Sequence, residues 1–128
     1  MIAKAIYNIL STETDITDLC SDRIYPNKAP DGAVLPYVVF HQIDGIPNKN
    51  KERQIKILTY RVQVDVYAET FDEAMTLADK INDTLSFKSG TFAGIEIDII
   101  TFDNQNDAFE ADTLVERVSQ DFLVRRKK

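Results

Sequence analysis

Hydrophobic residues recur along the first part of the chain at the spacing of a helix. Over residues 2–10 the gaps of three and four positions predict one apolar helix side, formed by Ile2, Ala5, Ile6, Ile9 and Leu10. A further turn is expected over residues 16–20. Residues 21–36 hold three prolines and one glycine, which favour irregular chain. Ile24 and Tyr25 are expected to attach this segment to the core.

Strict alternation of apolar and polar residues begins later. Residues 37–43 are rich in β-branched and aromatic side chains and predict a strand. Residues 54–68 alternate most clearly, with one side formed by Tyr60, Val62, Val64 and Val66. The segment between them, residues 44–52, is predicted to be an exposed loop. Together these segments indicate two neighbouring long strands.

A second helix is predicted to begin at Thr70, because Thr70 and Glu73 have the spacing of a capping box. The apolar side continues at helical spacing through Ala74, Leu77, Ala78, Ile81 and Leu85. The small alanines would let the helix lie close to a sheet. Residues 88–90 are expected to mark its end, with Gly90 or Gly94 free to adopt a positive φ.

Two more strands are predicted after this helix. Residues 95–102 alternate, with a core side expected from Ile95, Ile97 and Ile99. Residues 103–112 are interpreted as a polar, acidic connection. Residues 114–124 form the last predicted strand, whose inward side chains are Val118, Phe122 and Val124.

The element order α-β-β-α-β-β is typical of an α+β fold. We therefore predict an antiparallel sheet of about four main strands, with two helices packed on one face. A length of 128 residues suits a single domain spanning residues 1–128.

Composition narrows the function further. The formal net charge of −6 and the pI near 4.7 oppose general binding to nucleic acid, since affinity for phosphates comes from Lys and Arg. No apolar run approaches the roughly 20 residues that span a bilayer, and no targeting segment is recognisable. The single cysteine, Cys20, cannot form an intrachain disulfide. A cytoplasmic protein is expected.

Candidate catalytic and metal residues are few. His41 is the one histidine, and it stands within a predicted strand without a nucleophile motif nearby. Cys20 is interpreted as a small buried apolar side chain rather than a nucleophile. Glu96 and Asp98 share a strand side, which half-exposed alternation explains more simply than acid–base catalysis. We predict no catalytic residue.

Metal and cofactor motifs fail on spacing. Zinc prefers several His and Cys ligands, and the chain has two such residues. An EF-hand counted from Asp103 would meet Gln105, Ala108 and Leu114 where it requires Asp or Asn, Gly and Glu. The four glycines are scattered and form no phosphate cradle. We predict neither a metal site nor a cofactor site.

Two basic stretches remain. One holds Lys49, Lys51, Arg53 and Lys56, and the other ends the chain with Arg125, Arg126, Lys127 and Lys128. Either is most simply a solvated face or tail. The functional alternative is an electrostatic contact with an acidic neighbour, such as another copy of the same chain.

The order of several segments resembles a known family. Residues 23–26 (RIYP) are followed by residues 35–40 (LPYVVF), by residues 61–70 (RVQVDVYAET) and by the helix that starts there. This set resembles a phage and prophage family long catalogued only as a domain of unknown function. That family is similar in fold to tail-completion, or tail terminator, proteins of long-tailed bacteriophages.

The resemblance implies a structural role without catalysis or cofactor. Such proteins form a ring, commonly a hexamer, that caps the tail tube, meets the head connector and lets genomic DNA pass. The implied location is the bacterial cytoplasm during assembly and the virion afterwards, away from any membrane. The extended loop of the family, together with the basic C-terminus, suggests an assembly surface formed by Gly45, Ile46, Pro47, Asn48, Lys49, Asn50, Lys51, Arg53, Arg125 and Arg126.

Two alternatives stay open. A head-completion or connector adaptor of the same particle would share the small size and ring geometry. A regulatory α+β domain that binds a small molecule would instead require a concave apolar pocket with a few convergent polar groups.

Overall fold

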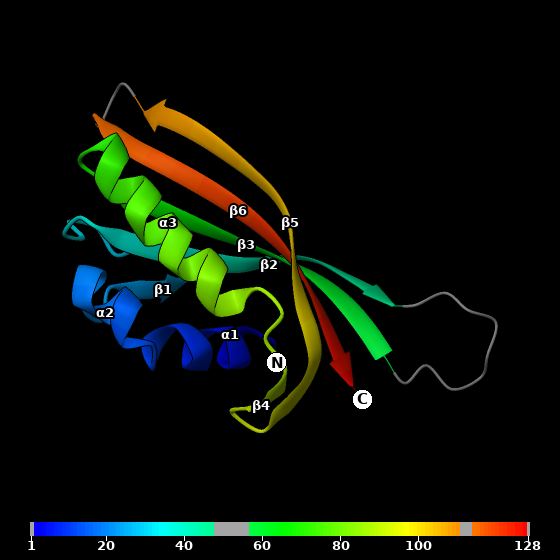
Figure 1. Cartoon of the computed structure of the whole chain (residues 1–128). Coiled ribbons are helices and arrows are strands. Elements are labelled where there is room, and N and C mark those ends of the chain that lie inside the picture. The colour runs from blue at the N-terminus through cyan, green and yellow to red at the C-terminus, as the bar shows by residue number, and fades with distance from the viewer. Residues whose placement is uncertain (1, 48–56, 111–113, 128) are drawn as a thin grey trace.

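The computed structural model describes residues 2–47, 57–110 and 114–127 (Figure 1). Within these ranges the chain forms three helices and six strands. They are α1 (Ile2–Ser11), α2 (Thr14–Cys20), β1 (Ile24–Pro26), β2 (Tyr37–Pro47), β3 (Ile57–Ala68), α3 (Phe71–Leu85), β4 (Gly90–Phe92), β5 (Ile95–Glu110) and β6 (Val115–Lys127). The predicted α+β class is confirmed.

The strands form one twisted sheet in the order β1-β2-β3-β6-β5-β4 (Figure 1). β1 runs parallel to β2, whereas the other neighbours are antiparallel. The predicted numbers of about four strands and two helices were therefore too low. The missed strands β1 and β4 have three residues each, which is too short for alternation to be recognised. The third helix, α2, is the short one that only a further turn had indicated.

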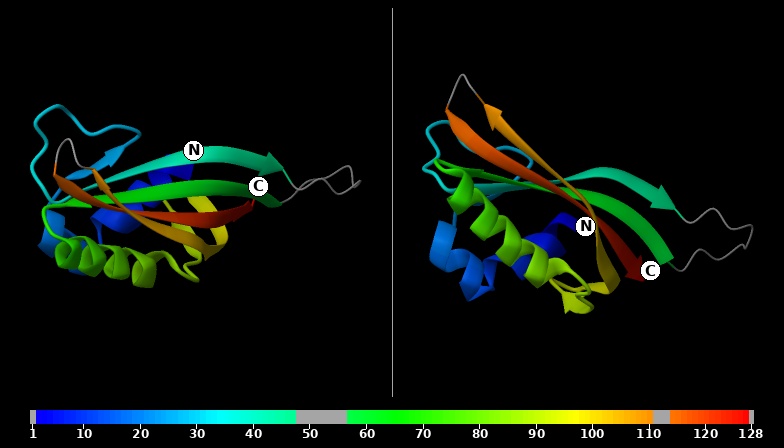
Figure 2. Two further views of the ribbon diagram at one scale, coloured as in Figure 1. Left: turned by 90° about the horizontal axis from the view of Figure 1, so that it is seen from above. Right: turned by 45° about the horizontal axis from the view of Figure 1, so that its top comes forward.

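The helices cover one face of the sheet and leave the other face without a helix (Figure 2). Every apolar residue predicted for the inner side of α1 is buried, as are the alternating valines of β3. The largest fully buried side chains include Ile6, Phe40, Leu77, Ile81 and Phe122. Removal of this apolar surface from water is the main driving force for the fold.

Both predicted long connections are partly strand. The expected loop 44–52 begins as sheet, because β2 continues to Pro47 and pairs with β3 as far as Leu58. The prediction of an acidic connection over residues 103–112 was wrong for most of its length, since β5 continues to Glu110 and pairs with β6. This part of β5 has a neighbour on one side only, so polar side chains on both of its faces can reach water.

A β-bulge overturned the prediction that Ile99 faces the core. The register of β5 against β6 shifts between Ile97 and Ile99, which leaves Asp98 as an extra residue. An extra residue reverses the alternation that follows it. Ile100 is consequently buried with no exposed area, and Ile99 is partly exposed.

The capping box at α3 is confirmed with one change. The Thr70 hydroxyl accepts a hydrogen bond from the Glu73 amide at 3.1 Å. The Glu73 carboxylate accepts from the amide of Glu69 at 3.3 Å, rather than from the amide of Thr70 itself. The helix ends at Leu85, earlier than expected, and Phe87 adopts a positive φ of 62° just beyond it.

Candidate functional site

The two predicted parts of the assembly surface lie at the same end of the sheet. Gly45, Ile46 and Pro47 are the last residues of β2 and pair with β3. Thr59 of β3 pairs with Ile46 on one side and with Arg125 of β6 on the other. The remaining predicted loop residues Asn48, Lys49, Asn50, Lys51 and Arg53, with Lys56, lie outside the described residues.

The basic C-terminus is not a tail, because β6 continues as strand to Lys127. Arg125 lies 3.9 Å from the Asp98 carboxylate, and Lys127 lies 3.5 Å from the Glu96 carboxylate. Glu96 and Asp98, considered above as an acid–base pair, thus serve as ion-pair partners of β6. Arg126 forms no ion pair with any described residue, and its Nε is buried without a hydrogen-bond partner there.

The helix-free face of the sheet carries polar side chains of both signs. Arg61 Nη1 lies 2.6 Å from Asp103 Oδ2 and 3.8 Å from Asp121 Oδ2. Gln63 Nε2 donates to Asp65 Oδ1 at 2.8 Å. An aromatic group lies at one end, where Tyr37 and Tyr67 stack with ring centroids 4.9 Å apart. This face can make polar contacts along most of its length.

The candidate catalytic residues are separated by the sheet. Cys20 lies in the core on the helix side, where burial raises the pKa of its thiol to about 11 and disfavours the nucleophilic thiolate. His41 is partly buried in β2, and it alternates with the core residue Phe40, so it belongs to the helix-free side. Neither residue can therefore activate the other. Among the described residues, no group of three potential metal ligands comes together.

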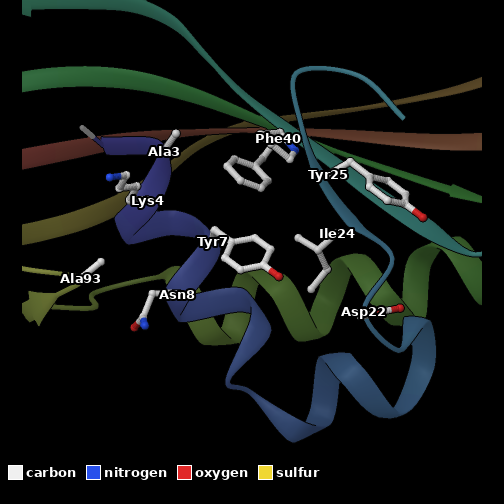
Figure 3. A pocket seen from close by; sticks show the side chains of 10 residues that line it. Ala3, Lys4, Tyr7, Asn8, Asp22, Ile24, Tyr25, Phe40 and Ala93 are labelled. Atoms are coloured by element: carbon white, nitrogen blue, oxygen red, sulfur yellow. The ribbon is translucent and has the colours of Figure 1, made fainter. Parts of the chain in front are cut away.

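A groove of about 680 Å³ opens between α1, β1 and the β4–β5 turn (Figure 3). Its floor is aromatic and aliphatic, with the rings of Tyr7 and Phe40 6.4 Å apart at their centroids and Ile24 beside them. Lys4 and Asp22 supply charges among its lining residues. Its volume lies within the range typical of small-molecule sites.

Sequence reasoning missed two features. The first is Gln120, a fully buried polar residue whose side chain donates a hydrogen bond from β6 to the backbone of α3. The second is the outer edge of β5, with the exposed side chains Phe102 and Phe109. β5 is polar on both faces in this region, so no alternation marked it as strand.

The described residues define a small α+β protein with one six-stranded sheet, one face of which is free of helices. Residues 4–126 match the family described as tail completion protein gp17, and the chain belongs to that family. No curated protein sequence gives a significant match. Within the described residues, no helix is long and apolar enough to cross a membrane.

Solved structures share the fold. The chain is similar to a chain from the virion of a native gene transfer agent particle, with a TM-score of 0.81, 16% identity, and coverage of 97% of this chain and 92% of that one. A second solved structure is similar over 92% of each chain, with a TM-score of 0.56 and 12% identity. At these identities the likeness concerns the fold.

Proposed function

We propose that this protein assembles as a homo-oligomeric ring, a hexamer, that caps the finished tail tube and offers the joining surface to the head connector. The observation that carries the proposal is the match to the tail completion family over residues 4–126. The fold shared with a chain of a virion particle supports it. The ring has no catalytic step, assembles in the bacterial cytoplasm and remains in the virion.

In this proposal the assembly surface includes the end of β2 and the end of β6. Gly45, Ile46 and Pro47 lie two strands from Arg125 and Arg126, which corresponds to roughly 10 Å at the usual strand spacing. The other predicted residues of this surface, Asn48, Lys49, Asn50, Lys51 and Arg53, lie outside the described residues and belong to the proposal by sequence alone.

Genomic DNA would pass through the ring without sequence-specific binding. Six copies at −6 each would carry −36, and like charge would keep DNA phosphates from adhering. The acids are not gathered on the helix-free face, where Asp65, Asp103 and Asp121 lie with Arg61 and Arg117. A channel wall formed by this face would therefore be nearly balanced in charge rather than strongly acidic.

The test combines light scattering with negative-stain microscopy. At high concentration, with or without purified tail tubes, the protein should form rings, and tubes mixed with it should carry a ring at one end. Tubes alone are the control. A protein that stays monomeric and binds neither tube nor connector would refute the proposal. Binding to the connector without the tube would favour the alternative, a head-completion adaptor.

The groove supports a second candidate of another class, a small-molecule-binding domain. Its aromatic floor and its two opposite charges have the chemistry of a site for a small amphipathic ligand. A ligand that binds only the folded state would raise the melting temperature with concentration. The substitution Tyr7→Ala should remove that rise. A compound library that leaves the melting temperature unchanged would exclude this function.

A further inference from the structure

The sheet has two open edges within the described chain. β4 covers β5 at Ile95–Ile97, and the backbone of Ile100 exchanges hydrogen bonds with Phe87 and Lys88 at 2.7 and 3.1 Å. The outer edge of β5 from Phe102 to Glu110 has a strand neighbour on one side only. β1 covers β2 only at Val38–Phe40, so β2 is open from His41 to Pro47. Backbone donors and acceptors along such edges can pair with another strand.

The longest open stretch of β5 pairs with β6 in a regular register. After the shift between Phe102 and Asn104, the pairing of β5 with β6 continues without interruption to Glu110. Bulges and inward charges usually protect an edge strand against pairing. The stretch from Asn104 to Glu110 has no bulge, and its exposed Phe109 adds apolar surface beside the edge.

The two edges have matching directions. β2, β3, β6 and β5 alternate in direction, so β5 is antiparallel to β2 within one copy. When two copies have the same orientation, β5 of one placed beside β2 of the next continues the antiparallel order. Because the edges are on opposite sides of one sheet, the contact is heterologous, and such a contact gives a ring when the rotation from copy to copy closes.

The displacement of the two open edges along the strand direction is also compatible with a closed ring. Asp44 of β2 lies level with Leu123 of β6, whereas Asn106 of β5, which is on the same face of the sheet, lies level with Ser119. Four residues of β6 correspond to about 14 Å, and four strand spacings to about 19 Å. Together they require a strand tilt of about 35°, within the range of closed barrels.

Charge on the two edges is mixed. At the end of β5, Arg117 pairs with Ala108 beside the acids Asp107 and Glu116. The open edge of β2 carries Asp44 and lies two strands from Arg126. Backbone pairing, rather than charge, would therefore have to hold the contact.

From the open edges and their directions, we infer that the subunit contact is strand addition between copies: Asn104–Glu110 of β5 pairs with the open edge of β2 in the next copy. This inference rests on the proposed ring and names the surface that closes it. A second copy is the occupant because both halves of the contact are present on one chain, on opposite edges of one sheet and with directions that match.

Chemical cross-linking tests the contact. Gln42→Cys and Asp107→Cys place thiols on the same face of the continued sheet, since Gln42 pairs with Val62 and Asp107 with Val118, and both positions are exposed. Cys20 is buried, which limits its reaction. A short bismaleimide should convert the double variant into a ladder of covalent oligomers. Each single variant and the parent chain should remain uncross-linked, since a heterologous contact needs both thiols. Cross-linked dimers of the Asp107→Cys variant alone would indicate β5–β5 pairing and overturn the inference.

A surface substitution beside the edge gives an independent readout. Phe109→Lys should raise the concentration for half-maximal assembly by about fivefold or more, because it removes apolar surface and adds a charge beside the edge. Phe87→Lys makes the same change at an exposed residue just beyond α3 and should leave assembly unaltered. Rings that form without a cross-linked ladder would overturn the edge contact and leave the ring intact. Absence of any self-association, with or without tail tubes, would refute the ring itself.

Discussion

The side-chain amide of Gln120 donates a hydrogen bond to the backbone carbonyl of Ala78 at 2.9 Å, which joins β6 to α3 in the middle of the core. Gln120 has no exposed area, and its amide also donates to Gln105 Oε1 at 3.1 Å. A buried amide without partners is costly, so these contacts fix where α3 can lie on the sheet.

Replacing Gln120 should separate packing from hydrogen bonding. We expect Gln120→Ala to lower the free energy of unfolding by about 2–4 kcal/mol, because it leaves a cavity and removes both hydrogen bonds. Gln120→Leu keeps most of the volume and should cost about 1 kcal/mol or less. Urea unfolding followed by circular dichroism measures both values. Equal losses in the two variants would show that packing contributes little.

The start of α3 depends on a local hydrogen bond. Thr70→Ala removes the hydroxyl that accepts from the Glu73 amide, and it should lower the free energy of unfolding by about 1 kcal/mol. Thr76→Ala, at an exposed position within the same helix, is the matched control and should have a small effect of either sign. Urea titrations of the two variants compare them directly. A Thr76→Ala loss as large as that of Thr70→Ala would rule out the capping role.

Burial of the Cys20 thiol predicts a pH dependence of stability. The pKa rises from an ordinary value of 9.0 to about 11 in the folded state, mainly because the charged thiolate is poorly solvated in the core. Below about pH 9 both states keep the proton, so the contribution of Cys20 is constant. Between pH 9 and 11 the unfolded chain loses the proton first, so stability falls as pH rises.

The variant Cys20→Ala isolates this contribution. Tyr and Lys titrations are common to both proteins, so only the parent should show the additional loss of stability between pH 9 and 11. The same burial predicts that Cys20 reacts slowly with a thiol reagent in the native state and rapidly in guanidinium chloride. Rapid reaction of the native protein, or parallel pH profiles, would contradict a buried thiol.

The elements that sequence reasoning predicted well bury one regular face. Val62, Val64 and Val66 alternate over the core, and the apolar side of α1 repeats at helical spacing, so local pattern and burial agree. The end of β5 shows the opposite case. Its side chains are polar on both faces, and its strand conformation comes from pairing with β6, a long-range contact that a local pattern does not contain.

Dependence on long-range pairing also limited how much of the candidate site could be predicted from the sequence. Arg125 and Arg126 were recognised as charged, yet their place beside the end of β2 depends on two strand pairings. The open edges could not be recognised because they follow from the shortness of β1 and β4, which cover only part of their neighbours. Gln120 offered no signal, because a glutamine in a strand is ordinary until its surroundings are known.

The contact between Arg61 and Asp103 links β3 to the second bulge of β5 across the helix-free face. The two side chains are 30% and 39% exposed, so solvent screens their attraction. We expect Asp103→Asn to lower the free energy of unfolding by about 1 kcal/mol or less at low salt. The effect should shrink further in 1 M NaCl, where the Debye length is about 3 Å.

Urea unfolding at both salt concentrations measures the effect of Asp103→Asn. Asp98→Asn is the control, since Asp98 lies 3.9 Å from Arg125 in a looser pair. A loss for Asp103→Asn that is large and independent of salt would show that Asp103 shapes the bulge through its hydrogen bond rather than through its charge.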